Sequence, residues 1–412
     1  MHRAHAAEIE RTLGENILRF WHPRCLDREK GGYAVHYGPR GEAKPGNKGI
    51  VTQARMLWLF ARVARSGCRP AEMLEAAEWG YRFLLDRMWD SRHGGFFWEV
   101  DAGRGEPVAP KKHVYGQAFG LYALSEYYLA GGPPEALQLA ARLFELLETK
   151  AHDAAHGGYV EFFNRDWAPA PPGEPGYMGD PKLKLMNTHL HLLEAMTTLY
   201  RASRREAARE RLLELITIES NAVVRKGLTA CTDKYDRDWR PRLDGENARV
   251  SYGHDLENIW LLMEANDAAG LPDAPLADLY RELFAYSLRY GYDEAKGGFF
   301  DGGMPGSPAD LRNKTWWVQA EALVCALRMH RLTSDPLYWR VFQKTWEFTR
   351  DHVVDWTTGE WHATVAPDGT AGGDKGGPWK AGYHNGRAMI ECLGMLRGMA
   401  DLSGLPRESR PR

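Results

Sequence analysis

Six apolar segments of the chain each open with polar or aromatic residues of kinds that transfer protons or bind ligands. The segments begin near residues 51, 112, 186, 251, 313 and 381. Apolar residues then follow at three- and four-residue spacing, which predicts helices. Four of the six openings carry histidine, more than packing alone explains. If the six helices start at one end of the molecule, the openings meet in one pocket, lined by Arg55, His113, Tyr115, Asn187, His189, His191, His254, Asp255, Glu257, Trp316, Trp317, Trp379, Tyr383 and His384.

These residue types indicate acid–base chemistry on a sugar. The start of a helix carries partial positive charge, which disfavours an imidazolium and stabilises a developing anion. A neutral imidazole is suited to proton transfer near pH 7. The flat faces of indole rings pack against the C–H faces of a pyranose while neighbouring polar groups bind its hydroxyls. The combination predicts proton abstraction next to the carbonyl of an open-chain aldose.

Other kinds of site have weaker support. His189 and His191 are two positions apart and would point to different faces of a helix, and the chain has no HExxH motif. It also has no GxxxxGK[ST] motif, and no GxGxxG between a strand and a helix. We therefore expect no metal and no cofactor. Two rivals stay open: a glycoside hydrolase that uses carboxylates among Asp255, Glu257 and Glu321, and a noncatalytic carbohydrate- or protein-binding barrel.

A repeated turn indicates how the helices are organised. An aspartate, three residues, Gly-Gly and an aromatic residue recur along the chain, and the first two intervals are both 63 residues. Apolar residues at helical spacing precede the turn, as in 72–89 and 136–151, and alternating residues after it suit a short hairpin. The four clear copies begin at Asp27, Asp90, Asp153 and Asp293, a degenerate copy lies near Asn221, and a sixth begins at Asp355.

Six helix pairs, each with a hairpin, predict an all-α (α/α)6 barrel over residues 1–412 as one catalytic domain. Six inner helices would be ringed by six outer ones, and the hairpins and loops would wall the active-site end. An open superhelix is the structural rival. Closure is favoured because neither end of the sequence looks like the polar capping repeat of a solenoid.

Composition limits the possible partners. The 412 residues are 44% hydrophobic, enough for a large core, and 53 basic against 55 acidic residues give no electrostatic reason to expect nucleic acid. The five cysteines form no CxxC pair, which is typical of a reducing compartment. No signal peptide or membrane-length apolar run is visible. We expect a cytoplasmic protein, a monomer or weak homodimer, whose partner is a mono- or disaccharide.

Four motifs carry a resemblance to a known family. The phrases MNTHLHLLEA, YGHDLEN-W, WWVQAEA and W-x-x-x-Y-H-N-G-R resemble the N-acylglucosamine 2-epimerase superfamily, and within it most of all the cellobiose 2-epimerases. The resemblance runs from the first helix to the last. It implies an (α/α)6 barrel that needs no metal or nucleotide for its chemistry and interconverts aldoses differing at C2.

The resemblance also implies a role for each matching residue. His254 and His384 correspond to two acid–base histidines, one removing the C2 proton to give a cis-enediolate and the other returning a proton to the opposite face. Arg55 corresponds to the arginine that stabilises the enediolate, and His191 to a histidine that assists ring opening. The remaining matches are polar pocket residues and sugar-stacking tryptophans: Tyr115, Asn187, Glu257, Trp379 and one of Trp316 and Trp317.

Three candidate residues are assigned structural roles, and two departures bear on the substrate. His113 and His189 are expected to be structural, and Asp255 to orient an imidazole or cap its helix. Asn258 and Ala381-Gly382 depart from the disaccharide epimerases near the site, which puts substrate length in doubt. Two alternatives therefore stay open within the superfamily: an aldose–ketose isomerase of the mannose–fructose type, and an N-acylglucosamine 2-epimerase.

Overall fold

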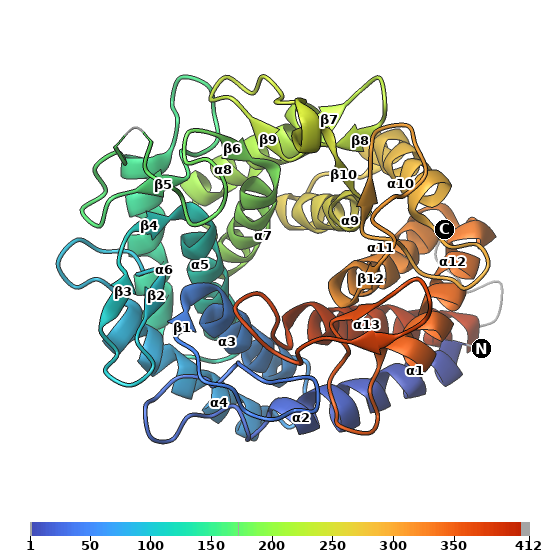
Figure 1. Ribbon diagram of the computed structural model, residues 1–412, viewed down its shortest axis with the longest axis horizontal. Helices are drawn as coiled ribbons and strands as arrows, with labels where there is room; N and C mark the ends of the chain where they lie inside the picture. The colour runs from blue at the N-terminus through green and yellow to red at the C-terminus, as the bar shows by residue number, and fades with distance from the viewer. Residues whose placement is uncertain (1, 172, 405–412) are drawn as a thin grey trace.

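The computed structural model describes residues 2–171 and 173–404. Six inner helices surround a common axis, and each contacts the next one in chain order. The last inner helix also contacts the first, which closes the ring (Figure 1). These helices are α3 (Ile50–Arg65), α5 (Val114–Leu129), α7 (Met186–Ser203), α9 (Tyr252–Ala269), α11 (Trp316–Thr333) and α13 (Tyr383–Gly404).

Outer helices cover the ring, each packed on the inner helix that precedes it in the chain. The first outer helix packs on the last inner one, so the two ends of the chain complete one pair. This closure excludes the open superhelix and confirms the (α/α)6 barrel. The outer helices are α1 (His2–Arg11), which continues through η1 (Thr12–Leu18) to α2 (Arg19–Trp21), α4 (Pro70–Phe83), α6 (Pro134–Leu146), α8 (Glu206–Thr217), α10 (Ala277–Gly291) and α12 (Pro336–Phe348).

The core lies between the two helix layers. Inner helices such as α5 are buried almost all round, whereas outer helices such as α6 have one apolar face toward the ring and one polar face toward solvent. Burial of apolar surface between the layers is the main driving force for this arrangement. Even so, none of the helices in residues 2–171 and 173–404 has the length and apolar character needed to cross a membrane.

Short antiparallel strand pairs lie where the inner helices begin. Four pairs precede or flank α3, α5, α9 and α11 and connect neighbouring units: β1 (Lys48–Gly49) with β2 (Glu99–Val100), β4 (Lys112–His113) with β5 (Phe162–Phe163), β10 (Val250–Ser251) with β11 (Gly302–Gly303), and β12 (Lys314–Thr315) with β13 (Thr364–Val365). Two further strands extend these pairs: β3 (Pro107–Ala109) adds to β2, and β14 (Ala371–Gly372) adds to β13. Two further pairs lie around the degenerate copy near Asn221. In the first, β6 (Lys184–Leu185), which precedes α7, pairs with β9 (Lys234–Tyr235). In the second, β7 (Val224–Arg225) pairs with β8 (Ala230–Cys231).

The repeated aspartate turn links each outer helix to its hairpin. In the second copy, Asp90 Oδ1 accepts hydrogen bonds from the backbone N–H groups of Arg92 and His93 at 3.1 and 3.3 Å. Gly94 and Gly95 both have φ of 71°, a left-handed conformation that glycine adopts without strain. The Gly-Gly pair therefore lets the chain reverse within the turn, as the repeat predicted.

The aspartates of the four clear copies and of the copy at Asp355 each also bind a lysine that precedes an inner helix. The carboxylate thereby fixes the start of that helix against the turn, and the lysine side chains are almost fully buried. The sequence analysis did not identify these lysines. The Nζ–Oδ2 distances are 2.7 Å for Lys48–Asp27, 3.1 Å for Lys112–Asp90, 3.1 Å for Lys184–Asp153, 2.9 Å for Lys314–Asp293 and 2.8 Å for Lys375–Asp355.

The fourth residue of five inner helices holds the backbone of the neighbouring hairpin. Gln117 accepts from Phe96 N at 2.7 Å and donates to Phe96 O at 2.9 Å. His189 occupies the same position in α7, and its Nε2 accepts from Tyr159 N at 2.9 Å. The predicted structural role of His189 is therefore confirmed. The five residues are Gln53, Gln117, His189, Asp255 and Gln319.

A belt of alternating charges links the inner helices at the end of the ring opposite the strand pairs. Each of the six contributes one charged side chain, with arginine on α3, α7 and α11 and glutamate on α5, α9 and α13. The alternation gives every arginine a carboxylate neighbour and so favours the observed helix order. The belt residues are Arg62, Glu126, Arg201, Glu264, Arg328 and Glu391.

Candidate active site

The structure brings ten of the fourteen residues expected to line the pocket together around one cavity of about 220 Å³, whereas His113, His189, Asp255 and Tyr383 do not line it. The hydroxyl of Tyr383 instead donates to Glu194 Oε1 at 2.6 Å. The cavity lies where the inner helices begin, at the end of the ring that carries the strand pairs. Residues from all six inner helices or the segments just before them reach it, as the sequence pattern predicted. The lining residues are Arg55, Tyr115, Asn187, His191, His254, Glu257, Trp316, Trp317, Trp379 and His384.

Helical spacing brings the polar side chains onto the faces that line the cavity. His254 and Glu257 are three residues apart on α9, and Asn187 and His191 are four apart on α7, so each pair shares a face. Ser251 caps α9 by accepting a hydrogen bond from His254 N at 3.5 Å. Both pairs lie in the first two turns of their helices, close to the N-terminal partial charge.

His384 is held in a defined orientation by a buried carboxylate. Its Nδ1 lies 2.6 Å from Glu321 Oε1, so Nδ1 carries the proton and donates a hydrogen bond to Glu321. The other ring nitrogen, Nε2, is then unprotonated and able to accept a proton. Burial lowers the pKa of His384 well below 6.5, and the charge of Arg55 adds to this effect. The neutral imidazole is therefore the form present at pH 7.

His254 faces the same cavity from another inner helix. Its ring lies 4.8 Å from the indole of Trp317, and the ring of His384 lies 5.7 Å from that indole. Within the described residues, no protein group is hydrogen-bonded to its imidazole. Burial lowers the pKa of His254, while Glu257 opposes that shift and favours the imidazolium. The two imidazoles therefore lie beside the same indole ring in one cavity.

A buried arginine that the sequence analysis missed connects the acidic residues behind the cavity. Arg387 Nη2 donates to Glu257 Oε1 at 2.6 Å and to Glu321 Oε1 at 2.8 Å, and its Nη1 donates to Glu194. Glu194 in turn accepts from His191 Nδ1 at 3.1 Å. Each residue lies inside a motif quoted above, but a single polar residue on an apolar helix gives no sign of its distant partners.

The donor set of the site does not favour a metal ion. The ligand atoms of Glu257, Glu321 and His384 lie within 4.8 Å of one another, the one such group among the described residues. The guanidinium of Arg387 already donates to both carboxylates, and Glu321 accepts from the imidazole. A cation at this point would have to displace a buried arginine.

Arg55 and Asn187 supply groups for binding oxygen atoms. Arg55 donates from Nη1 to the carbonyl of Trp379 at 2.8 Å and from Nη2 to the hydroxyl of Tyr115 at 3.1 Å. Its Nε is buried without a hydrogen-bond partner, as is Asn187 Oδ1. Buried polar atoms are normally paired. These two atoms are therefore candidates for contacts with a bound ligand.

Aromatic side chains line the mouth of the cavity. Trp379 is 44% exposed, and its ring lies 6.0 Å from Tyr115 and 6.1 Å from Trp98. Trp98 in turn lies 5.3 Å from Tyr177. An exposed tryptophan beside a polar cavity can pack against a sugar ring at low conformational cost. Trp316 also lines the cavity, and its indole Nε1 has no hydrogen-bond partner.

Two other expectations concern residues beside the site. His113 caps α5, because its Nδ1 accepts from Tyr115 N at 3.2 Å, which confirms the structural role. Asp255 does not cap its helix and is not hydrogen-bonded to an imidazole, contrary to expectation. Its Oδ1 accepts from Cys231 N at 2.8 Å, and burial raises its pKa to about 7. It occupies the hairpin-holding position that glutamine fills in other units.

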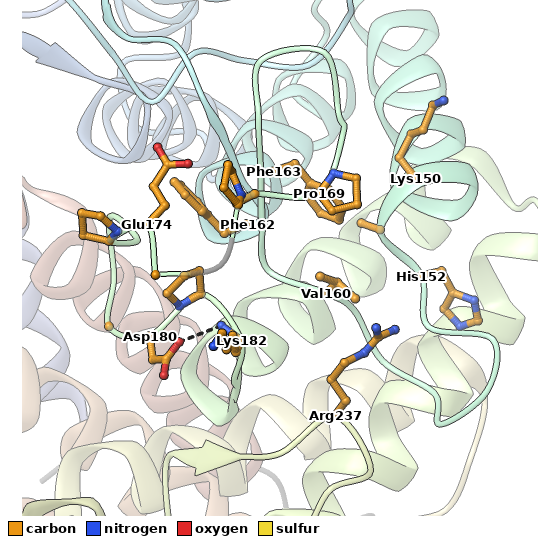
Figure 2. Close-up of a pocket in the computed structure, with 17 residues that line it drawn as sticks. Lys150, His152, Val160, Phe162, Phe163, Pro169, Glu174, Asp180, Lys182 and Arg237 are labelled. Carbon is orange, nitrogen blue, oxygen red and sulfur yellow. Dashed lines mark hydrogen bonds between the residues drawn. The ribbon is translucent and has the colours of Figure 1, made fainter.

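A larger cleft of about 800 Å³ lies apart from these residues (Figure 2). Lys150 and Arg237 lie on one side of it and Glu174 and Asp180 on the other. None of the ten predicted residues lines it. Its one histidine, His152, is held by Glu214 at 3.0 Å and Arg211 at 2.8 Å. Proton-transfer chemistry is therefore better supported in the smaller cavity.

Comparison with known proteins finds similar sequences and structures over most of the chain. Residues 31–388 match the family model described as N-acylglucosamine 2-epimerase (GlcNAc 2-epimerase). A cellobiose 2-epimerase of Bacteroides fragilis is 35% identical over 399 residues, which cover 94% of this chain and 98% of that protein. A D-mannose isomerase of Marinomonas mediterranea is 26% identical over 402 residues, covering 95% and 96%. The solved structure of cellobiose 2-epimerase from Spirochaeta thermophila has a TM-score of 0.86 and 36% identity, covering 97% and 98%.

Proposed function

Because this chain belongs to the N-acylglucosamine 2-epimerase family, we propose that it inverts the configuration at C2 of an aldose with a free reducing end. Glucose and mannose units are the expected substrates, and β-1,4-linked disaccharides such as cellobiose are the preferred choice. The observation that carries the proposal is the pair of imidazoles, His254 and His384, flanking Trp317 in one cavity.

The reaction begins with loss of the C2 proton from the opened sugar. One neutral imidazole takes the proton at an unprotonated ring nitrogen, and the C2–H electron pair forms the C1=C2 bond of a cis-enediolate. The carbonyl π electrons move to the C1 oxygen, which gains negative charge. After rotation about C2–C3, the second imidazole, in its protonated form, gives a proton to the opposite face of C2. The C1=C2 electrons form the new C2–H bond, and an electron pair of the C1 oxygen re-forms the C1=O bond.

The surroundings of the two histidines suit these complementary tasks. His384 has the more strongly lowered pKa and an Nδ1–H fixed by Glu321, which suits a base in the neutral form. Burial lowers the pKa of His254 as well, but Glu257 opposes that shift, so His254 suits the acid better than His384 does. In the reverse direction the two exchange tasks by microscopic reversibility. Arg55 supports the proposal because a guanidinium near the C1 oxygen would stabilise the enediolate charge.

The proposal is tested by incubating the protein with cellobiose in D2O. The expected result is a disaccharide with mannose at its reducing end and one deuterium at C2. A His254→Gln/His384→Gln double variant is the matched control and should form neither. Failure of the parent protein to form the manno-epimer from cellobiose, lactose, glucose or N-acetylglucosamine would refute the proposed function. Free monosaccharide as product would favour the glycoside hydrolase.

A second candidate function is aldose–ketose isomerisation. It is favoured by the similarity to a D-mannose isomerase along 95% of the chain. The same enediolate gives a ketose when the proton is returned to C1 instead of C2. Fructose as the dominant product from mannose, with little glucose, would support this candidate over the epimerase.

A further inference from the structure

Arg387 has an unusual position for an ionised side chain. It lies on α13 three residues after His384, it is 1% exposed, and its guanidinium carbon lies 4.7 Å from the indole of Trp260. It does not line the cavity. Burying a guanidinium is costly unless its charge and its N–H groups are matched by acceptors. Here the acceptors come from the three inner helices α7, α9 and α11.

Two of these acceptors also hold a histidine of the cavity. Glu194 accepts from Arg387 through Oε1 and from His191 Nδ1 through Oε2 at 3.1 Å. Glu321 Oε1 accepts from Arg387 at 2.8 Å and from His384 Nδ1 at 2.6 Å. The third acceptor, Glu257, lines the cavity itself. One arginine thus lies directly behind three cavity residues on three different helices.

We propose that Arg387 is a positioning residue that fixes the tautomers of His191 and His384 through Glu194 and Glu321. Burial opposes ionisation and raises the pKa of Glu321, whereas the charge of Arg387 favours ionisation, and the pKa of Glu194 is lowered. Arg387 and Trp260 donate to Oε1 and Oε2 of Glu321, so Glu321 acts as an acceptor on both oxygens, as an ionised carboxylate does. Each imidazole must then carry a proton on Nδ1, so that Nε2 is the unprotonated nitrogen of the neutral ring. The consequence for catalysis rests on the proposed function, whereas the tautomers themselves do not.

Removal of the guanidinium would change the protonation of the three carboxylates that it binds and of the histidines that they hold. Glu194, Glu257 and Glu321 would be three buried carboxylates without their shared cation, so protonation of at least one is favoured. A protonated carboxyl group can donate to an imidazole and move its proton to Nε2. The charge of Arg387 also lowers the pKa of His384, so its loss raises that pKa. The charged and titratable groups around His384 are Arg55, His191, Glu194, His254, Glu257, Glu321 and Arg387.

The test combines two variants with a matched control. Arg387→Met removes the charge and Arg387→Lys keeps it, while Arg201→Met removes a partly buried arginine that bonds to Glu264 at the opposite end of the ring. Nitrogen-15 NMR of the histidine side chains reports the tautomers, and spectra of His191→Gln and His384→Gln assign the signals. In the parent, both residues should be protonated on Nδ1.

In Arg387→Met the two signals should move toward the Nε2–H form, and kcat for epimerisation should fall roughly 100-fold with little change in KM. The acid-side inflection of kcat/KM should move to higher pH. Arg387→Lys should recover part of the activity, and Arg201→Met should leave the tautomers and the inflection unchanged. Unaltered tautomers and an unaltered pH profile in Arg387→Met would overturn the proposal.

Two fallback measurements keep the role of Arg387 testable. If the parent does not epimerise any sugar, the NMR measurement still decides the role of Arg387. If Arg387→Met does not fold, Glu194→Gln takes its place, because it removes the carboxylate of His191 and leaves that of His384. Loss of the Nδ1–H form at His191 alone would support the proposal, and retention of it would overturn the proposal.

Discussion

Replacement of Glu321 by glutamine is the sharpest test of how His384 is prepared for catalysis. Glu321 accepts three hydrogen bonds: from His384 Nδ1 at 2.6 Å, from Arg387 at 2.8 Å and from Trp260 Nε1 at 2.8 Å. The first two reach Oε1 and the third reaches Oε2. Glutamine keeps the shape of the side chain but replaces one acceptor oxygen by an NH2 group.

Neither orientation of the glutamine amide satisfies all three donors. If its oxygen faces His384 and Arg387, its NH2 group faces the N–H of Trp260. If its oxygen faces Trp260, its NH2 group faces Arg387 and donates to His384 Nδ1, which moves the imidazole proton to Nε2. In the first orientation, the glutamine NH2 group and the Trp260 N–H face each other as two buried donors without an acceptor. In the second, His384 loses its unprotonated Nε2 and can no longer act as a base.

We expect kcat of Glu321→Gln to fall by about 10²- to 10⁴-fold, the usual contribution of a general base, or about 3–5 kcal/mol of transition-state stabilisation. The assay is the initial rate of manno-epimer formation from cellobiose at saturating substrate. Glu126→Gln is the control, because Glu126 is a buried carboxylate that accepts from Arg65 at the other end of the ring. Its stability should fall, as that of Glu321→Gln does, while its kcat stays near the parent value. A kcat for Glu321→Gln within about threefold of the parent, where a lost base predicts at least 100-fold, would refute this reasoning.

Three further predictions test other parts of the site and the fold. Burial lowers the pKa of both His254 and His384 below 6.5, and the mechanism needs one of them neutral and the other protonated. We therefore expect kcat/KM to fall at both low and high pH, and an acid-side inflection above pH 6.5 would contradict this. Trp379→Ala should raise KM for cellobiose about fivefold and leave kcat nearly unchanged, because an aromatic contact contributes about 1 kcal/mol; an unchanged KM would remove Trp379 from the binding site. Asp90→Asn should lower the free energy of unfolding by about 3–5 kcal/mol, because it leaves buried Lys112 without its carboxylate. Denaturant unfolding measures this loss, and an Asp90→Asn/Lys112→Met double variant should recover part of the lost stability.

Local patterns made the architecture predictable. The spacing of Asp27, Asp90 and Asp153 identified the repeating unit, and the polar openings of the apolar segments identified the inner helices. Both signals are local because a turn needs glycine at positions with positive φ, and a helix start needs groups that bind exposed N–H donors. Closure of the ring then placed ten predicted residues around one cavity. Membership of a carbohydrate epimerase family is likewise confirmed.

Long-range pairing was not predictable in the same way. Each lysine partner of a repeated aspartate lies about 20 to 30 residues further along the chain, and its spacing varies with the loop between them. Arg387 and Glu194 are separated by 193 positions and meet only because six helices close into a ring. Asp255, beside His254, is expected from the sequence to orient an imidazole or cap its helix. Its side chain in fact points to the hairpin backbone at Cys231.

The most direct test of two imidazoles on opposite faces of C2 uses the single variants His254→Gln and His384→Gln. Each is incubated in D2O with the gluco- and the manno-epimer separately, and deuterium at C2 is measured by NMR. We predict that each variant exchanges the C2 hydrogen of one epimer without inverting it, and that the two variants act on different epimers. Loss of exchange from both epimers in one variant, with full inversion retained by the other, would contradict the account.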